Sequence, residues 1–310
     1  MKRYDCTFVG DINPDIVMMA QQLPVLGREL MCDDFYITLG GSTGICAGVF
    51  GNLGAKAAFY GRLGDDFLGK FTVETIAGCG VDTSHIRVDH GCTTSVTVSC
   101  TLPTDRALMS YDGSHKRLAP EDVPFSLIDE TRHIHVGSFF LQKDLMPMYL
   151  ELFRQAHQRG VTTSLDAGWD PTENWDYGIR ELLRYVDVFF PNESEAYAIT
   201  KKDSPLAAAR ELAQYCRVAV VKCGRDGSVL VTEGKELSCP IYDAFKPLDF
   251  TGAGDSYNAG FLYAMLQGKD LAASMRYGSA SAGLRISLNR REKPFATGEE
   301  VERVVSDYRA

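Results

Sequence analysis

The segment Asp249–Leu262, DFTGAGDSYNAGFL, places one acid, Asp255, inside a run of small residues. Such a run can open a helix whose first backbone N–H groups have no partner within the helix and therefore attract an anion. Two explanations remain open for Asp255. The carboxylate could stabilise the helix N-terminus by about 0.3–1 kcal/mol, or it could act as a base beside a bound phosphate.

The familiar phosphate-binding loops are absent. The segment GDDFLGKF at residues 64–71 has the spacing of a P-loop, but Phe71 stands where that loop needs a Mg²⁺-binding hydroxyl. The segment VGDINPD at residues 9–15 follows the first predicted strand and lacks the glycines of a dinucleotide fingerprint. A P-loop enzyme and an NAD-dependent oxidoreductase are both disfavoured.

Composition restricts the class of protein further. The chain has 310 residues, of which 45% are hydrophobic, and carries a formal net charge of −9. This balance predicts a globular protein and argues against a nucleic-acid or anionic-membrane surface. The nine cysteines have no C-x-x-C spacing, and no apolar run is long enough to span a membrane. We expect a cytoplasmic protein with free thiols.

Apolar runs alternate with helical patterns along the chain. We expect strands at residues 4–10, 57–61, 133–140, 161–168, 186–192 and 218–224, and helices at residues 146–160, 204–216 and 254–268. Most of the strands are apolar throughout, as in a parallel sheet that is covered on both faces. The alternation predicts an α/β fold with helices on both sides of the sheet.

Two segments differ from this pattern. Residues 13–39 contain no long helix, and residues 92–111 alternate and turn at the tripeptide PTD, residues 103–105. We expect both to form a small β-sheet that serves as a lid over a cleft.

From end to end, the chain resembles the ribokinase, or phosphofructokinase-B, family of carbohydrate kinases. Residues 40–69, GGSTGICAGVFGNLGAKAAFYGRLGDDFLG, resemble the first family signature, and Asp249–Leu262 resembles the second. Residues 23–41 fit the stretch that leads into the double glycine. The resemblance implies one doubly wound, mostly parallel α/β domain over residues 1–310 with a β-sheet lid. It also implies an ATP-dependent kinase of a small sugar or sugar-like acceptor.

For the phosphate side, the resemblance implies an anion hole of backbone amides at Gly252, Ala253, Gly254 and Asp255, with Asp255 as general base. Asn192 and Glu195 match an N-x-x-E motif that organises Mg²⁺ through water. On their own, the same two residues also fit a helix capping box. Lys222, Gly224 and Gly227 match the ATP-side loop, and Asp249 and Thr251 match positions that help to bind a monovalent cation, K⁺, in several members.

For the acceptor side, Asn13 and Asp15 match the sugar-binding N-x-D pattern, and Gly40 and Gly41 would bring backbone close to the same substrate. An Asn-Pro turn with a capping Asp is the alternative. Ile45 stands where members commonly carry Asn. Either an apolar or deoxy part of the acceptor lies there, or another group makes the missing contact.

Several further points stay open. Asp166 alone is retained from a family pattern at residues 166–170, His115 is a candidate substrate contact, and His133 and His135 share one face of a strand without the further ligands of a zinc site. A nucleoside kinase and a non-catalytic sugar- or nucleotide-binding regulator are the rival functions. Related lids often pair between subunits, so a homodimer through the lid is a further expectation.

Overall fold

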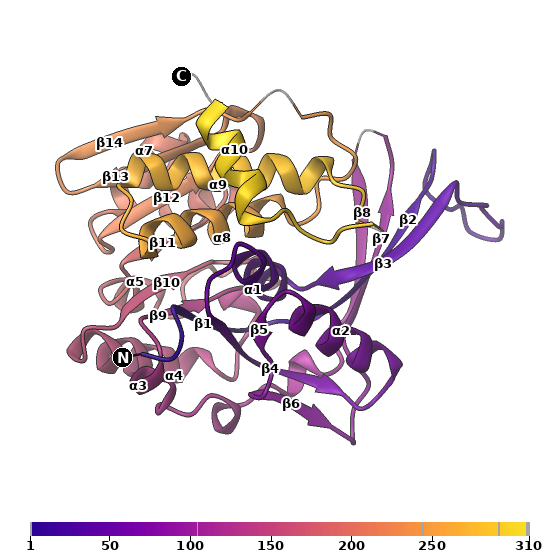
Figure 1. Ribbon diagram of the computed structural model, residues 1–310, viewed down its shortest axis with the longest axis horizontal. Coiled ribbons are helices and arrows are strands. Elements are labelled where there is room, and N and C mark those ends of the chain that lie inside the picture. Colours follow the sequence, from indigo (N-terminus) through magenta and orange to yellow (C-terminus); the bar gives the residue numbers. More distant parts are fainter. Residues whose placement is uncertain (1, 104, 243–244, 291, 308–310) are drawn as a thin grey trace.

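The structure is a computed structural model that describes residues 2–103, 105–242, 245–290 and 292–307. A 10-stranded sheet forms its centre, with helices on both faces, and a separate 4-stranded sheet projects from one side (Figure 1). The main sheet has the order β14-β13-β12-β11-β10-β9-β1-β4-β5, with β6 also paired to β4. Only the pairs β12–β13 and β13–β14 are antiparallel. The predicted fold class is confirmed.

The strands of the main sheet are β1 (Cys6–Val9), β4 (Ala57–Gly64), β5 (Val81–Asp82), β6 (Ile86–Asp89), β9 (His133–Val136), β10 (Thr162–Leu165), β11 (Val188–Phe189), β12 (Val218–Lys222), β13 (Ser228–Thr232) and β14 (Lys235–Cys239). The helices are α1 (Ser42–Asn52), α2 (Phe67–Gly78), α3 (Leu127–Glu130), α4 (Met146–Gln158), α5 (Ile179–Leu183), α6 (Glu193–Thr200), α7 (Pro205–Leu212), α8 (Ala253–Leu266), α9 (Leu271–Ser287) and α10 (Gly298–Asp307).

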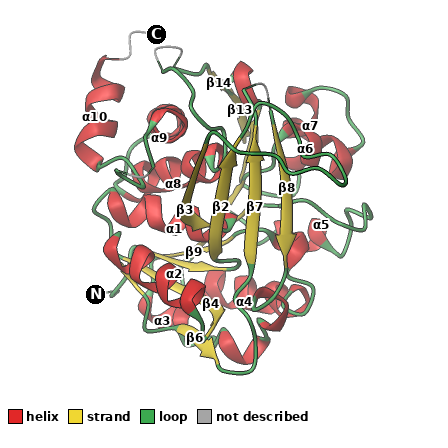
Figure 2. Cartoon of the chain, turned by 90° about the vertical axis from the view of Figure 1, so that its right-hand side faces the viewer, coloured by secondary structure: helices red, strands yellow, loops and turns green. Residues whose placement is uncertain are grey.

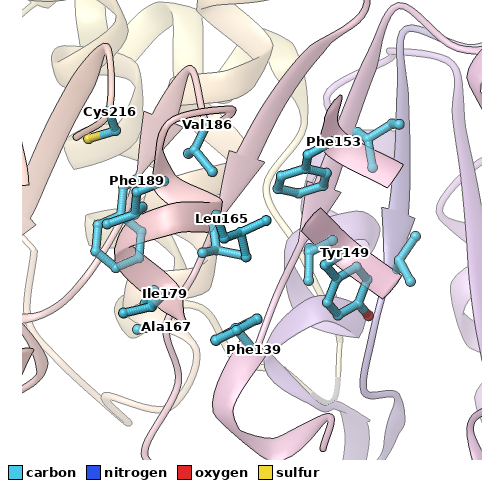
Figure 3. Close-up of a cluster of buried hydrophobic side chains, with 14 of the residues drawn as sticks. Phe139, Tyr149, Phe153, Leu165, Ala167, Ile179, Val186, Phe189 and Cys216 are labelled. Carbon is cyan, nitrogen blue, oxygen red and sulfur yellow. The ribbon is translucent and has the colours of Figure 1, made fainter. Parts of the chain in front are cut away.

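Two hydrophobic cores lie on opposite faces of the main sheet. Successive strand residues point to opposite faces, so Val221 packs in the core under α3 to α7 while Val220 packs in the core under α1, α2 and α8 to α10. Figure 3 shows part of the first core, where Phe153 of α4 and Leu165 of β10 lie among other buried side chains. The continuous apolar runs of the central strands are explained by this burial on both sides.

The small sheet is the predicted lid. It consists of β2 (Asn13–Met19), β3 (Asp34–Gly40), β7 (Val96–Thr101) and β8 (Arg106–Tyr111), in the order β3-β2-β7-β8, and faces the viewer in Figure 2. The pairs β2–β3 and β7–β8 are antiparallel, whereas β2–β7 is parallel. The turn between β7 and β8 is closed by a hydrogen bond from Leu102 N to Asp105 O. Thr104, in the middle of the predicted PTD turn, lies outside the described residues.

The predicted strands and helices match observed elements with shifted ends. One such difference is at residues 133–140, where β9 ends at Val136. Ser138 then adopts a left-handed conformation with φ 49°, and a short 3₁₀ turn follows at Phe139–Leu141. Residues 137–140, GSFF, lie within the predicted strand, but in the structure they turn away from the sheet.

Candidate active site

In the described part of the chain, the N-terminus of α8 has no side-chain cap and carries unpaired backbone amides. Gly252 precedes the helix with φ +78°, a conformation that L side chains rarely adopt, and no side chain caps the helix. Among the described residues, the amides of Gly252, Gly254 and Asp255 have no acceptor, while that of Ala253 lies 3.4 Å from Phe250 O. Unpaired N–H groups at a helix start favour an anion.

Asp255 stands in the first turn of this helix. Its carboxylate accepts no hydrogen bond from the residues that the structure describes, although part of its surface is accessible. Protein atoms packed around the carboxyl, together with the nearby charge of Asp166, raise the pKa of Asp255 to about 8. A carboxylate with this pKa is a far stronger proton acceptor than an ordinary aspartate.

A buried cluster lies beside Asp255. Lys222, the last residue of β12, donates to Asp166 Oδ2 at 2.7 Å, and Asn258 Nδ2 donates to the same oxygen at 2.7 Å. Burial alone would raise the pKa of Asp166, but Lys222 holds it below its usual range. A Cβ built on Gly254 would lie 3.6 Å from Lys222 Nζ. The cluster therefore places one fixed ammonium group directly beside the amides of α8.

Asn192 and Glu195 form a reciprocal capping box at the start of α6. Asn192 Oδ1 accepts from Glu195 N at 2.9 Å, and Glu195 Oε2 accepts from Asn192 N at 2.8 Å. The structure therefore contains the helix capping box that the sequence allowed as an alternative. Glu195 is nevertheless unusual for a capping residue, because burial and the charge of Asp166 raise its pKa to about 7.

The predicted ATP-side glycines lie in the turn after β12. Gly224 and Gly227 both have positive φ, 52° and 84°. A Cβ on Gly227 would lie 2.0 Å from Cys239 O, so no larger residue fits there. Lys222 donates to Asp166 and lies next to Gly254, as described above.

The predicted acceptor residues are assembled at the start of β2 and the end of β3. Asn13 Nδ2 donates to Asp15 Oδ1 at 3.1 Å, and burial raises the pKa of Asp15 to about 6. A Cβ on Gly40 would lie 2.0 Å from the same oxygen, and one on Gly41 would lie 2.8 Å from Asp11 O. The double glycine therefore lets the end of β3 approach the carboxylate of Asp15 and the start of α1 approach the backbone of Asp11.

Asp11, a residue that the sequence did not single out, caps α1. Its carboxylate accepts from Ser42 N at 2.8 Å, from Thr43 N at 3.1 Å and from Thr43 Oγ1 at 2.6 Å. The charge of Asp11 also contributes to the raised pKa values of Asp15 and Asp255. The charge of Asp11 thus couples the predicted acceptor residue Asp15 to the predicted base Asp255.

A cavity of about 520 Å³ lies between the lid and the body. Its lining includes Asn13, Ser95, Thr97 and Ser110 of the lid side and His115. The side chain of His115 bonds to Asp112 through Nδ1, while its buried Nε2 has no partner in the described part of the chain. Of the predicted substrate-binding residues Asn13, Asp15, Gly40, Gly41 and Ile45, Asn13 alone lines the cavity, together with the candidate substrate contact His115.

Ile45 lies in the core rather than at this cavity. It is 2% exposed, and its branches lie 3.1–3.2 Å from the place that a Cβ on Gly252 would take. Its contact is therefore with the turn that opens α8. His133 and His135 are likewise structural, since both are buried and bond to Ser164 Oγ at 2.7 Å.

The oxygens expected to bind a monovalent cation are already bonded to a side chain. Arg290 donates from Nη1 to Asp249 Oδ2 and from Nη2 to Asp249 O and Thr251 O, each at 2.8 Å. Burial alone would raise the pKa of Asp249, but the charge of Arg290 holds this pKa below the usual range.

Sequence reasoning missed several of these residues. Asn258 follows Asp255 by three positions in the same signature, so helical spacing would have placed both on one face. Arg285 is fully buried, donates to Thr251 O at 3.3 Å and, like Arg290, carried no sequence signal. Across the described ranges, no group of three or more acidic, histidine or cysteine side chains could hold a metal ion, and no helix has the length and apolar character needed to cross a membrane.

Known proteins share this architecture and sequence pattern. The profile described as pfkB family carbohydrate kinase matches residues 4–290. The chain is 28% identical over 290 residues to 5-dehydro-2-deoxygluconokinase of Geobacillus thermodenitrificans, covering 88% of this chain and 85% of the relative. It is 26% identical over 306 residues to ribokinase of Haemophilus influenzae, covering 96% and 97%.

Among solved structures, Arabidopsis thaliana ribokinase complexed with ribose and ATP has a TM-score of 0.83 at 24% identity, covering 98% of this chain and 99% of the other. A putative ribokinase II from E. coli in complex with ATP and Mg²⁺ has a TM-score of 0.86 at 18% identity, covering 98% and 100%. These two structural similarities show that the fold is shared. With the profile covering nearly the whole sequence, the chain belongs to the pfkB family of carbohydrate kinases and is itself a kinase.

Proposed function

We propose that this kinase transfers the γ-phosphate of ATP, with Mg²⁺, to a hydroxyl of a small sugar or sugar-like acceptor. The observation that carries the proposal is the pairing of two features in one turn of helix: unpaired amides at the start of α8 and, beside them, the unbonded carboxylate of Asp255 with its raised pKa.

In the proposed phosphoryl transfer, different residues have different roles. The amides of Gly252, Ala253, Gly254 and Asp255 would hold the transferred group, and the ammonium of Lys222 would add positive charge beside them. Asp255 would remove the proton of the attacking hydroxyl. The turn carrying Gly224 and Gly227 would lie along the nucleotide, where missing side chains permit close approach.

Glu195 and Asn192 fit a role in organising Mg²⁺ indirectly. Both Glu195 oxygens accept hydrogen bonds from Asn192, yet each keeps a second lone pair for a bound water. Mg²⁺ retains waters and is commonly held through one or two carboxylates plus substrate phosphates, where it neutralises developing charge. The transfer as proposed makes no use of K⁺, since Arg290 already holds Asp249 and Thr251.

Asn13, Asp15, Gly40 and Gly41 would form the acceptor site at the base of the lid. Asp15 keeps lone pairs for hydroxyl donors, and the lining of the adjoining cavity of about 520 Å³ includes hydroxyl and amide side chains together with charged and apolar ones. The size suits a small polar ligand.

A nucleoside kinase is the second candidate function. Tyr111, Leu118, Leu141 and Pro171 give the same cavity an apolar portion that could receive a base. A solved adenosine kinase from Sinorhizobium meliloti is 25% identical with a TM-score of 0.80, covering 93% of this chain and 95% of the other.

A coupled assay of ADP release, with ATP, Mg²⁺ and a panel of sugars, sugar acids and nucleosides, tests both candidates. The panel should include ribose, 5-dehydro-2-deoxygluconate and adenosine. Turnover with sugars supports the proposal, whereas turnover with nucleosides alone supports the second candidate. No acceptor-dependent ADP release across the panel would refute both and favour a non-catalytic binding protein.

A homodimer through the lid is part of the proposal. The edge strand β8 exposes Leu108 and Met109, and it pairs with β7 on one side only. Sedimentation equilibrium at micromolar concentration tests this, and a Met109→Glu variant should shift the population toward monomer.

A further inference from the structure

Arg290 is buried at the turn that leads into α8. Its side chain is 1% exposed, and that of its partner Asp249 is 4% exposed. The guanidinium makes a forked set of three bonds, to one carboxylate oxygen and to the carbonyls of Asp249 and Thr251. The planar, permanently charged arginine head is well suited to such a fixed group of oxygens.

The Asp249 carboxylate has no acceptor position left for a metal ion. Thr251 donates to Oδ1 through both its N–H and its hydroxyl, each at 2.8 Å. Tyr36 from lid strand β3 donates to Oδ2 at 3.0 Å, beside Arg290. A carboxylate offers about four lone-pair sites, and all of them are used. K⁺ at these oxygens therefore does not fit the residues present.

The guanidinium of Arg290 lies next to the proposed phosphate site. Thr251, whose carbonyl Arg290 holds, is followed directly by Gly252 and by the open amides of α8. Arg285 donates to the same carbonyl at 3.3 Å. The direction of the Thr251 carbonyl fixes the plane of the peptide whose N–H belongs to Gly252. A guanidinium at this place both orients that amide and adds positive charge behind it.

We propose that Arg290 is a tethered replacement for a monovalent cation, so that phosphoryl transfer by this chain proceeds without K⁺. The inference rests on the proposed function, because it assigns a positioning role within the same phosphate site. Because the guanidinium is covalently attached to the chain, its positive charge is present at this site whatever the salt composition. The occupancy of the site by a dissociable ion would instead depend on the concentration of that ion.

The wild-type protein provides the first test. Its kcat, its MgATP affinity by calorimetry and its Tm are compared in tetramethylammonium, Na⁺ and K⁺ buffers of equal ionic strength. We expect less than about a twofold difference in kcat and in affinity, and a Tm shift below about 1 °C. K⁺-specific activation or tightening of MgATP binding beyond about tenfold would overturn the proposal.

Variants provide the second test. Arg290→Ala should lose about 10- to 100-fold in kcat in tetramethylammonium and regain part of it with K⁺ or methylguanidinium. Arg159→Ala, which removes an exposed Arg–Asp pair on the surface, is the matched control and should show neither change. A folded Arg290→Ala protein that retains wild-type turnover without K⁺, or that neither cation restores, would overturn the proposal.

The two proposals fail in different ways. If no acceptor supports ADP release by wild-type protein, the proposed function fails, and the cation dependence of MgATP affinity and Tm still decides the role of Arg290. If Arg290→Ala does not fold, the wild-type comparison decides it alone.

Discussion

Replacing Asp255 by asparagine removes the proposed proton acceptor while keeping the size of the side chain. With a pKa of about 8, only about one Asp255 in ten is ionised in the free enzyme at pH 7. General-base catalysis contributes about 10²- to 10⁴-fold, or about 3–5 kcal/mol of barrier. The full deficit of Asp255→Asn should therefore appear above pH 8, and it should narrow to about 10- to 10³-fold at pH 7.

The assay is kcat/KM for the acceptor at saturating MgATP between pH 6 and pH 9.5. For wild-type protein this parameter should rise about tenfold per pH unit and level off near pH 8, since it reports the free enzyme. The Asp255→Asn profile should be flat. Asp129→Asn, an exposed aspartate paired with Arg159, is the matched control and should keep the wild-type profile.

The same substitution should stabilise the fold at high pH. A carboxyl whose pKa is raised on folding contributes stability that is present below its unfolded pKa and is lost as the pH rises through about 8. Asp255→Asn should therefore have a higher Tm than wild-type protein at pH 8–9, by about 2–4 °C per kcal/mol of relieved charge. Wild-type turnover in this variant, or an activity loss accompanied by a lower Tm at every pH, would refute the assignment of Asp255 as base.

Three further predictions follow from the site. Asn13→Ala and Asp15→Ala should each raise acceptor KM about 5- to 150-fold, as expected for lost hydrogen bonds of about 1–3 kcal/mol, while MgATP KM stays constant; an unchanged acceptor KM in both would place the acceptor elsewhere. Gly252→Ala should lower stability by about 1–3 kcal/mol in chemical denaturation and raise MgATP KM, because φ is +78° and the new Cβ meets Ile45; equal stability would contradict the strained turn. Glu195→Gln should raise the Mg²⁺ concentration for half-maximal activity about tenfold, and a Mg²⁺ titration curve that overlays wild type would rule out its proposed role.

The fold was predictable because its signals are local. Strands such as Val218–Lys222 are apolar up to their last residue, and helices such as Met146–Gln158 have helical spacing of their apolar residues. The period and length of these patterns indicate a parallel sheet covered on both faces. The end of β9 was not predictable in this way. Phe139 and Phe140 continue the apolar run, and only the left-handed turn at Ser138 removes them from the sheet.

The site was predictable only where its residues belong to one short segment. Gly252 to Asp255 could be read together, because a helix start is a local structure. Arg290 reaches Asp249 across 41 positions, and Asp166 meets Asn258 across 92. Such pairings depend on how strand ends and helices are brought together, which no local pattern records. The surroundings of Ile45 were not predictable from the sequence either, since its contact with Gly252 joins residues that are far apart in the chain.

The cap that Asp11 forms on α1 has a consequence for ligand selection. Two glycine-preceded helices begin close together, with Ile45 of α1 in contact with the turn that opens α8, and either could have attracted a negatively charged ligand. By supplying α1 with a resident carboxylate, the chain removes one of two competing docking positions. In the proposed site, a triphosphate would therefore meet the unpaired amides of α8 rather than those of α1.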